Sequence, residues 1–406
     1  MTNHRYDKNE LIQFKKEVDA ELFRILEWWI HYSKSESNKA FYGHVDNFNK
    51  PDKTAPISLV LISRLLWTFS SAYKYLRYPS YLNFANDVYE YLIENFYDAT
   101  HSGMYWSIFP DGSVNSSIKK AYGNAFSLYG LAAYYDISKN NDVMDLCIEL
   151  FETIENQFKD KEYSGYIESL ARDWSTIEDV RLSEKDQNAI KSMNTHLHIL
   201  EAYTQLHSIS KSEKVKESIG QLLTLFEKNI IDPSSFQQHL FFNNNLDIIS
   251  TQISYGHDIE AAWILYEASK EIKDKSKITT FEVMAVSMSN IVAESTSPDG
   301  AIYNEFDKHT GKISYDIDWW PQAEAMVGFF NAYQISGDNY FLKKSIASWN
   351  LIKSKFVDTE NGEWFWGYTN EGVLLNREKA GFWKCPYHNS RSCMEISRRI
   401  NLLLMQ

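Results

Sequence analysis

The chain has 406 residues, of which 44% are apolar and 15% are aromatic, and its formal net charge is −13. An acidic chain lacks the basic surface that nucleic acids and anionic membranes require, so we expect neither as a partner. The three cysteines are odd in number and form no CxxC pair, which argues against a disulfide framework and favours a reducing compartment.

The N-terminus and the longest apolar run bear on location. Residues 1–22 are polar and charged and contain no apolar stretch of the kind that a secretory signal needs. The longest apolar run, residues 57–69, is interrupted by Ser58, Ser63 and Arg64, so it is not suited to span a bilayer. We therefore expect a cytoplasmic protein.

Apolar residues recur at helical spacing along most of the chain. Segments that are apolar on nearly every side alternate with segments that are apolar on one side only, which is typical of buried and half-exposed helices. In chain order, the predicted helices span residues 11–31, 59–76, 81–95, 125–135, 143–158, 195–206, 213–228, 259–268, 323–333 and 393–404. Residues 159–190 break the alternation with a long, charged segment, and a loop of this length can cover a functional site.

Short stretches between the helices are rich in glycine and aromatic residues. Three of them predict β-hairpins, with an Asp-Gly or Thr-Gly turn in the first two: residues 103–114, 300–313 and 362–374. Glycines that mark such turns recur about every 60 residues, with one double step, at Gly43, Gly103, Gly165, Gly300 and Gly362. We expect the missing turn near residues 241–245.

A second series of residues repeats with a similar period. These six polar or aromatic residues, most of them at predicted helix starts, are 58 to 72 residues apart: Arg64, Tyr122, Asn194, His257, Trp320 and His388. Such a period predicts six similar helix pairs, each placing one functional candidate at the same end of the molecule.

Six helix pairs predict an all-α fold, namely a closed (α/α)6 barrel with short β-hairpins in its connecting loops. An open solenoid of helix pairs is the alternative, and the number of units favours closure. No linker rich in proline, glycine and serine divides the chain, so we expect a single domain over residues 1–406.

Two predicted helices begin with histidines. Asn194 and His198 are four residues apart and share a helix face, whereas His196 points elsewhere. His257 and Glu260 are three residues apart, so the carboxylate is expected to fix the tautomer of the imidazole. A core histidine that is hydrogen-bonded to a backbone carbonyl is the alternative for the first helix.

Other positions offer aromatic or charged side chains. Two adjacent tryptophans, ending at Trp320, precede a proline at a helix start, so one indole is expected to line a cavity. Residues 381–391 precede the last helix and offer His388 as an acid or base and Trp383 as a stacking platform. Arg64 interrupts an apolar helix, which predicts that it points into a polar cavity.

Three other functions stay open at this point. Three histidines could bind a metal. However, His196 and His198 diverge on their helix, and none of the three has a second ligand at a zinc-like spacing, so we expect no metal. Asp258, Glu260 and Glu324 could supply the carboxylate pair of a glycosidase, although Asp258 at a helix start also suits the helix dipole. The abundant aromatic residues would also suit a non-catalytic sugar-binding protein.

Six blocks of the sequence carry a family resemblance. They are YGNAFSLYGLAAYY, NTHLHILEAYT, YGHDIEAAWILYEA, DWWPQAEAMVGF, WFWGY and GFWKCPYHNSRSCMEI. They closely resemble the cellobiose 2-epimerases of the N-acylglucosamine 2-epimerase superfamily, over most of the chain. The resemblance implies an (α/α)6 barrel that interconverts glucose and mannose at the reducing end of β-1,4-linked disaccharides such as cellobiose, mannobiose or lactose.

The resemblance also implies no metal or nucleotide cofactor. The expected partner is a small disaccharide, and the protein is expected to be a monomer or a weak homodimer. A mannose 2-epimerase or an aldose–ketose isomerase acting on free monosaccharides is the alternative, because these enzymes share the barrel.

Each candidate residue has a role implied by the resemblance. His257 and His388 correspond to acid/base groups that flank C2, and His198 to a third histidine that assists ring opening. The residues implied to bind the substrate are Arg64, Tyr122, Asn194, Glu260, Trp320, Trp383 and Asp186. An imidazole with a pKa of ~6.5 is suited to remove a proton next to a carbonyl, and inversion of C2 needs a second imidazole on the other face.

Overall fold

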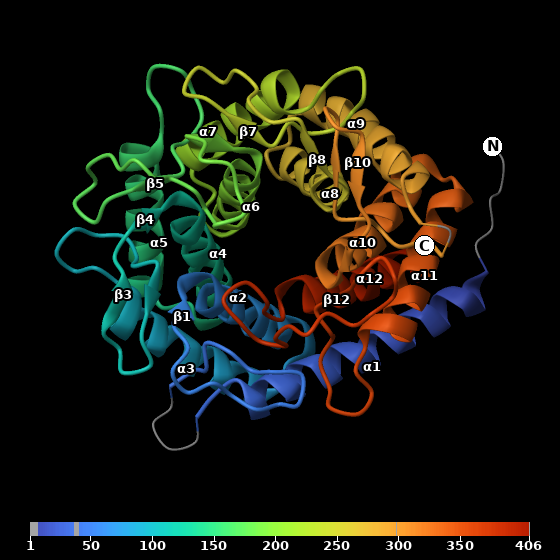
Figure 1. Cartoon of the computed structure of the whole chain (residues 1–406), viewed down its shortest axis with the longest axis horizontal. Coiled ribbons are helices and arrows are strands. Elements are labelled where there is room, and N and C mark those ends of the chain that lie inside the picture. The colour runs from blue at the N-terminus through green and yellow to red at the C-terminus, as the bar shows by residue number, and fades with distance from the viewer. Residues whose placement is uncertain (1–6, 36–39, 298, 406) are drawn as a thin grey trace.

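The computed structural model describes residues 7–35, 40–297 and 299–405. Within this part of the chain, an inner ring of helices surrounds a central space and an outer layer of helices surrounds the ring (Figure 1). The inner helices are α2 (Leu59–Leu76), α4 (Ala121–Ser138), α6 (Met193–Ser210), α8 (Tyr255–Glu271), α10 (Trp319–Ser336) and α12 (Tyr387–Leu404). Each contacts the next, and α12 contacts α2, so the ring is closed and the open solenoid is excluded.

Each outer helix packs against the inner helix that precedes it in the chain, except that α1 packs against α12. The outer helices are α1 (Lys8–Tyr32), α3 (Pro79–Phe96), α5 (Asn141–Thr153), α7 (Glu213–Leu225), α9 (Lys275–Glu294) and α11 (Asn339–Leu351). Three of them continue as a π-helical turn: η1 (Ile154–Phe158), η2 (Phe226–Ile230) and η3 (Ile352–Phe356). The pairs of inner and outer helices form the predicted (α/α)6 barrel.

Short antiparallel strands tie the units together at one end of the ring. In each case a strand just before an inner helix pairs with a strand just after the following outer helix. The pairs are β1 (Ile57–Ser58) with β2 (Ser107–Ile108), β4 (Lys119–Lys120) with β5 (Ser169–Leu170), β6 (Lys191–Ser192) with β7 (Phe241–Phe242), β8 (Gln252–Ser254) with β9 (Glu305–Asp307), and β11 (Ile317–Asp318) with β12 (Gly367–Tyr368). This pairing places the first residues of five inner helices at the same end of the barrel.

Two of the three predicted hairpins form. Strand β2 continues into β3 (Val114–Ser116), and β9 continues into β10 (Lys312–Ser314). The third prediction is wrong in part, because the strand at 367–368 pairs with β11 and makes only an isolated bridge, from Tyr368 to Leu374, within its own stretch. The neighbouring unit therefore competes successfully for the backbone of this segment.

The turn that was expected near residues 241–245 lies earlier, at residues 232–237. In three other units the amide of an aspartate donates to the carbonyl five residues later, as in the bond from Asp98 N to Gly103 O. The same bond joins Asp232 N to Gln237 O. Phe236 has a φ of 54° in this turn, so a phenylalanine takes a left-handed position and the glycine signal is missing from the sequence.

The inner helices are buried on almost every side, and glycines allow two pairs of them to approach closely. A Cβ atom on Gly130 of α4 would lie 2.6 Å from the carbonyl oxygen of Ser63 in α2. A Cβ on Gly328 of α10 would lie 2.6 Å from a side-chain carbon of Ile259 in α8 and 2.7 Å from its carbonyl oxygen. Among the described residues, no helix is long and apolar enough to cross a membrane.

We expect Gly328→Ala to destabilise the barrel by about 1–3 kcal/mol, because the new methyl group overlaps the backbone of α8 and cannot be relieved by a side-chain rotation. Thermal unfolding followed by circular dichroism measures the effect. Gly220→Ala in α7 is the control, since nothing lies within 4 Å of a Cβ at that position. Helix propensity alone makes this control neutral or stabilising, so equal melting temperatures for the two variants would contradict the close-packing argument.

Candidate active site

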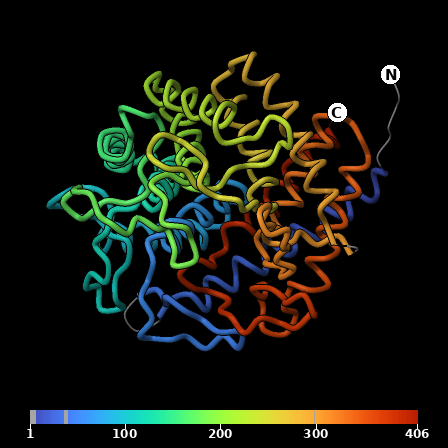
Figure 2. Tube along the Cα trace, turned by 45° about the horizontal axis from the view of Figure 1, so that its top comes forward, coloured from blue at the N-terminus to red at the C-terminus, as the bar shows by residue number. Residues whose placement is uncertain are grey.

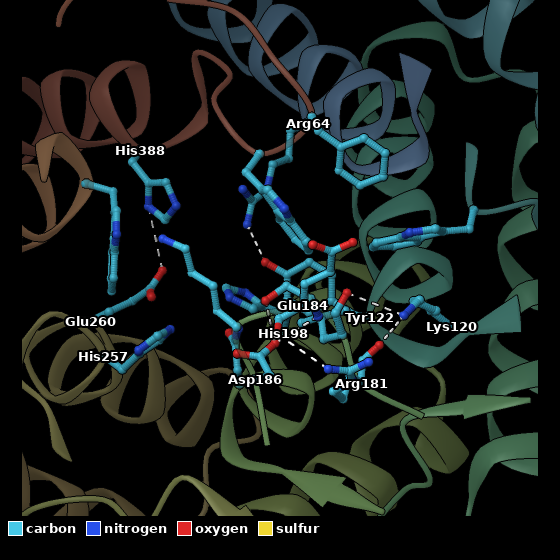
Figure 3. A pocket seen from close by; sticks show the side chains of 18 of the residues that line it. Arg64, Lys120, Tyr122, Arg181, Glu184, Asp186, His198, His257, Glu260 and His388 are labelled. Carbon is cyan, nitrogen blue, oxygen red and sulfur yellow. Dashed lines mark hydrogen bonds and ion pairs between the residues drawn. The ribbon is translucent and has the colours of Figure 1, made fainter. Parts of the chain in front are cut away.

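A cavity of about 650 Å³ opens at the end of the barrel where the inner helices begin (Figure 3). Its wall includes all ten residues that the sequence singles out: Arg64, Tyr122, Asp186, Asn194, His198, His257, Glu260, Trp320, Trp383 and His388. The chain between β5 and β6 and the segment before α12 both contribute to the wall, and Figure 2 traces both segments.

The recurring anchors converge because their helices begin together. Tyr122, Asn194, Trp320 and His388 are each the second residue of an inner helix, and His257 is the third residue of α8. A side chain in the first turn of an inner helix can point into the mouth of the ring. Arg64 lies one turn deeper, as the sixth residue of α2, and it reaches the same cavity from within the barrel.

His388 is held from behind by a carboxylate. Its Nδ1 lies 2.7 Å from Oε1 of Glu324 and 3.9 Å from Oε1 of Glu260. A carboxylate accepts hydrogen bonds, so Nδ1 carries the proton and Nε2 is left for the cavity. Burial lowers the pKa of His388 well below its ordinary value, and the positive charges of Arg64 and Arg391 lower it further.

His257 is held by a neutral group. Its Nδ1 lies 2.7 Å from Oγ of Ser254. Among the described residues, the ring makes no hydrogen bond to Glu260. The prediction that Glu260 fixes the tautomer of His257 is therefore wrong; Glu260 instead accepts a hydrogen bond from Arg391 at 2.6 Å. Burial lowers the pKa of His257 to about 3, so the imidazole is neutral.

Both imidazoles pack against one indole. The ring centroid of Trp320 lies 4.7 Å from that of His257 and 5.6 Å from that of His388. The two rings come from α8 and α12, and Figure 3 shows them on the same side of the cavity with Glu260 between them. A small molecule resting in this corner would meet an imidazole from each of two helices.

Arg391 organises the buried floor beneath the cavity, and its role was not identified from the sequence. Its guanidinium donates to Glu260 and Glu324 at 2.6 Å each, and also to Glu201 and to the hydroxyl of Tyr387. Desolvation raises the pKa of Glu260 and of Glu324, and Arg391 counteracts this for both. The sequence signal that could have found it is its position three residues after His388, because residues three apart lie on the same face of a helix.

The third histidine has a similar support. Nδ1 of His198 lies 3.0 Å from Oε2 of Glu201, so the carboxylate sets its tautomer as Glu324 does for His388. The neighbouring histidine, His196, faces away from the cavity, where its ring accepts from Tyr166 N and contacts the carbonyl of Ser192. The predicted division between His198 and His196 is confirmed.

Arg64 points into the cavity wall, as its sequence environment predicts. Its Nη2 donates to the hydroxyl of Tyr122 at 2.7 Å, and its guanidinium lies 4.1 Å from the ring centroid of Phe126. Nε of Arg64 and Oδ1 of Asn194 have no hydrogen-bond partner among the described residues. Both atoms are also shielded from solvent.

The outer part of the cavity is aromatic. The ring of Trp383 lies 5.8 Å from that of Trp106 and 6.1 Å from that of Tyr122. Trp106 lies in the predicted hairpin stretch 103–114 but was not identified as a site residue, because it is not a member of either repeat series. An aromatic wall of this kind can stack against the C–H face of a sugar ring.

Residues 179 and 181–186 also line the cavity. The ammonium group of Lys120 donates to the carbonyls of Arg181 and Leu182, which fixes this loop to the start of α4. Oδ2 of Asp186 accepts from the amide of Ser183 at 2.9 Å and from its hydroxyl at 3.0 Å. The long segment thus covers the site, as predicted, and Lys120 is a further residue that the sequence analysis missed.

The side chains of Glu260, Glu324 and His388 are close enough together to ligate a metal ion. However, the guanidinium of Arg391 already bonds both carboxylates, so it supplies the positive charge that an ion would bring. The same pairing engages Glu260 and Glu324, which are two of the three carboxylates that the sequence offered for glycoside hydrolysis. Asp258 faces away and accepts from Gln238 N at 2.9 Å, which is a contact with a neighbouring loop rather than with its own helix end.

Known proteins resemble this chain along its whole length. The model of the N-acylglucosamine 2-epimerase family matches residues 40–392. A cellobiose 2-epimerase from Bacteroides fragilis is 38% identical over 385 residues, which cover 94% of this chain and 98% of that protein. A second cellobiose 2-epimerase, from Dictyoglomus turgidum, is 37% identical over 391 residues, which cover 95% of this chain and 99% of that protein.

Solved structures agree with this. The structure of a cellobiose 2-epimerase from Spirochaeta thermophila superposes with a TM-score of 0.91 at 37% identity, and all of both chains is covered. A D-mannose isomerase structure has a TM-score of 0.82 at 16% identity, a level at which only the fold is shared. Taken with the family match and the barrel itself, these similarities establish that the chain belongs to the N-acylglucosamine 2-epimerase family.

Proposed function

We propose that this protein is a disaccharide 2-epimerase, which interconverts glucose and mannose at the reducing end of β-1,4-linked disaccharides such as cellobiose. The observation that carries the proposal is the pair of imidazoles, on two different helices, that share the indole of Trp320. Nδ1 of His257 is hydrogen-bonded to Ser254, and Nδ1 of His388 is hydrogen-bonded to Glu324. The Nε2 atom of each ring is therefore the one left to act on a ligand in the cavity.

The reaction begins when the reducing sugar opens to expose an aldehyde at C1. The proton on C2 is then acidic, and Nε2 of one histidine removes it while the C–H electron pair forms the C1=C2 bond of a cis-enediolate. The second histidine returns a proton to C2 from the opposite face, which inverts the centre. Two bases are needed because a single imidazole would return the proton to the face from which it came.

The enediolate oxygens need positive or donor groups. Arg64 and the hydroxyl of Tyr122, which are already bonded to each other, lie in the cavity wall close to His198. We assign them to the oxygen at C1, with His198 assisting ring opening. Asn194 and Glu260 bind hydroxyl groups of the sugar, and the reaction needs neither a metal nor a nucleotide.

The outer half of the cavity supports a disaccharide over a monosaccharide. Trp383, with Trp106 beside it, offers an aromatic plane beyond the corner that holds the two histidines. Asp186 and its loop line the same cavity, and we assign them to the second sugar. A free hexose would leave this half filled with water and would gain nothing from these contacts.

We further infer that residues 1–406 act as one catalytic domain in the cytoplasm. The ring is closed by its first and last inner helices, so the cavity depends on the whole chain. Removal of any unit would open the ring and expose the cavity.

Incubation with cellobiose in heavy water tests the proposed reaction. We expect the proton NMR signal of C2 to disappear as deuterium replaces the proton, because the abstracted proton exchanges with solvent on the imidazole. A second set of signals should appear from the mannose-containing epimer. Binding without exchange would indicate a sugar-binding protein, and release of glucose would indicate a glycosidase. Faster turnover of free mannose than of any disaccharide would favour the monosaccharide alternative.

His257→Ala and His388→Ala should each lower kcat at least 100-fold with unchanged circular dichroism, because general acid–base catalysis is typically worth ~100- to 10,000-fold. Steady-state assays with cellobiose measure the effect. His309→Ala is the matched control, since this histidine is exposed on a hairpin turn. Wild-type turnover in either site variant would remove that histidine from the mechanism.

Trp383→Ala should separate the two sugar subsites. Loss of an aromatic face that is worth ~1.5–3 kcal/mol when covered should raise KM for cellobiose by about 10- to 100-fold. The small activity toward mannose should change little, because mannose does not reach this ring. Equal effects on both substrates, measured side by side, would contradict a platform for the second sugar.

A further inference from the structure

Three inner helices begin with a serine at the same position, but one of these serines does not cap its helix. Ser58 Oγ accepts from Leu61 N at 3.0 Å, and Ser192 Oγ accepts from Thr195 N at 3.2 Å, which are ordinary N-cap bonds. Ser254 is the N-cap residue of α8 and makes no side-chain cap bond. Its hydroxyl contacts the ring of His257, three residues later, at 2.7 Å.

The hydroxyl of Ser254 therefore does not cap α8 but bonds to the imidazole of His257. An N-cap bond stabilises a helix, and α8 lacks this bond. Ser254 is nearly completely buried and lies in strand β8, where it pairs with Glu305 of β9. The sheet register fixes its backbone, so the hydroxyl is a rigid point from which the ring of His257 is oriented.

We propose that Ser254 is a positioning residue for His257 in the proposed epimerisation, on which this inference rests. It holds Nδ1 so that Nε2 points at C2 of the sugar. A hydroxyl can accept from Nδ1–H. Nε2 can take the C2 proton only when Nδ1 carries the ring hydrogen, so the hydroxyl of Ser254 accepts from Nδ1–H both before and after the ring takes the proton.

The other histidine has a charged partner in place of a hydroxyl. Glu324 can only accept, so Nδ1 of His388 keeps its proton throughout, and the carboxylates beneath it are tied to Arg391. The charged or titratable groups that act on His257 are His198 of α6, Glu324 of α10 and Arg64 of α2, and among the described residues none of these three is hydrogen-bonded to its ring. Among the described residues, Ser254 is thus the hydrogen-bonding partner that orients His257.

Ser254→Ala tests the proposal in the full-length protein. We expect kcat for cellobiose to fall about 10- to 100-fold, because a misplaced reacting group costs up to about 100-fold, while KM and the melting temperature stay close to wild type. Ser254→Thr keeps the hydroxyl and suits the extended backbone of β8, so it should restore most of the activity. Asp274→Ala removes a real cap, from α9, and should lower the melting temperature without changing kcat.

Isotope effects in the two directions give a sharper readout. One histidine removes the C2 proton of the glucose epimer and the other removes that of the mannose epimer. In Ser254→Ala, only the epimer that is deprotonated by His257 should show an increased effect of C2 deuteration on kcat. For the other epimer, reprotonation by His257 becomes slow, so the effect of C2 deuteration should shrink and the solvent isotope effect should grow.

The outcomes separate this inference from the proposed function. If wild-type protein does not exchange C2 hydrogen of cellobiose, the epimerase proposal fails. If wild-type protein turns over cellobiose but Ser254→Ala matches it in kcat and in both isotope effects, only the role of Ser254 is overturned. A variant with a lower melting temperature and unchanged kinetics would show that Ser254 serves the helix instead.

Discussion

The buried guanidinium of Arg391 is the interaction on which the rest of the site depends. Three carboxylates from three different inner helices converge beneath the cavity, and each would be costly to bury alone. Arg391 bonds all three, from a fourth helix, and so joins α6, α8, α10 and α12 at one point. Two of these carboxylates then turn toward histidines, so the cation that stabilises the floor also orients His198 and His388. Stability and the arrangement of the bases have the same origin here.

Ring closure supplies the second constraint. Each short strand pair joins the start of one inner helix to the segment that leads into the next unit, so the inner helices begin at a common level. Residues at the first helical positions are then neighbours in space, although they are more than fifty residues apart in the chain. The close contact at Gly328 keeps α8 and α10 near enough for His257 and Trp320 to touch.

The sequence was informative wherever a pattern repeats and misleading wherever a single contact decides. Helical periodicity predicts every inner helix to within about six residues at each end, because burial on all sides leaves a long apolar run. The largest error is at α12, which begins at Tyr387 instead of 393, so His388 and Arg391 lie inside this helix and not before it. Spacing on one helix, in contrast, did not reveal that Glu260 turns to Arg391 while His257 turns back to Ser254. Such choices depend on side chains from other helices. Phe236 in a left-handed turn and Trp106 in a loop likewise leave no periodic trace.

The different supports of the two histidines suit a reversible reaction. An epimerase must remove a proton from either face, so each imidazole acts as base in one direction and as acid in the other. His388 gains a proton above two carboxylates, which stabilise the resulting positive charge. In the proposed reaction His257 gains one beside a hydroxyl, and burial disfavours the positive charge on both rings. The two charged states therefore differ in their hydrogen-bonding partners, which are a carboxylate behind His388 and a hydroxyl behind His257.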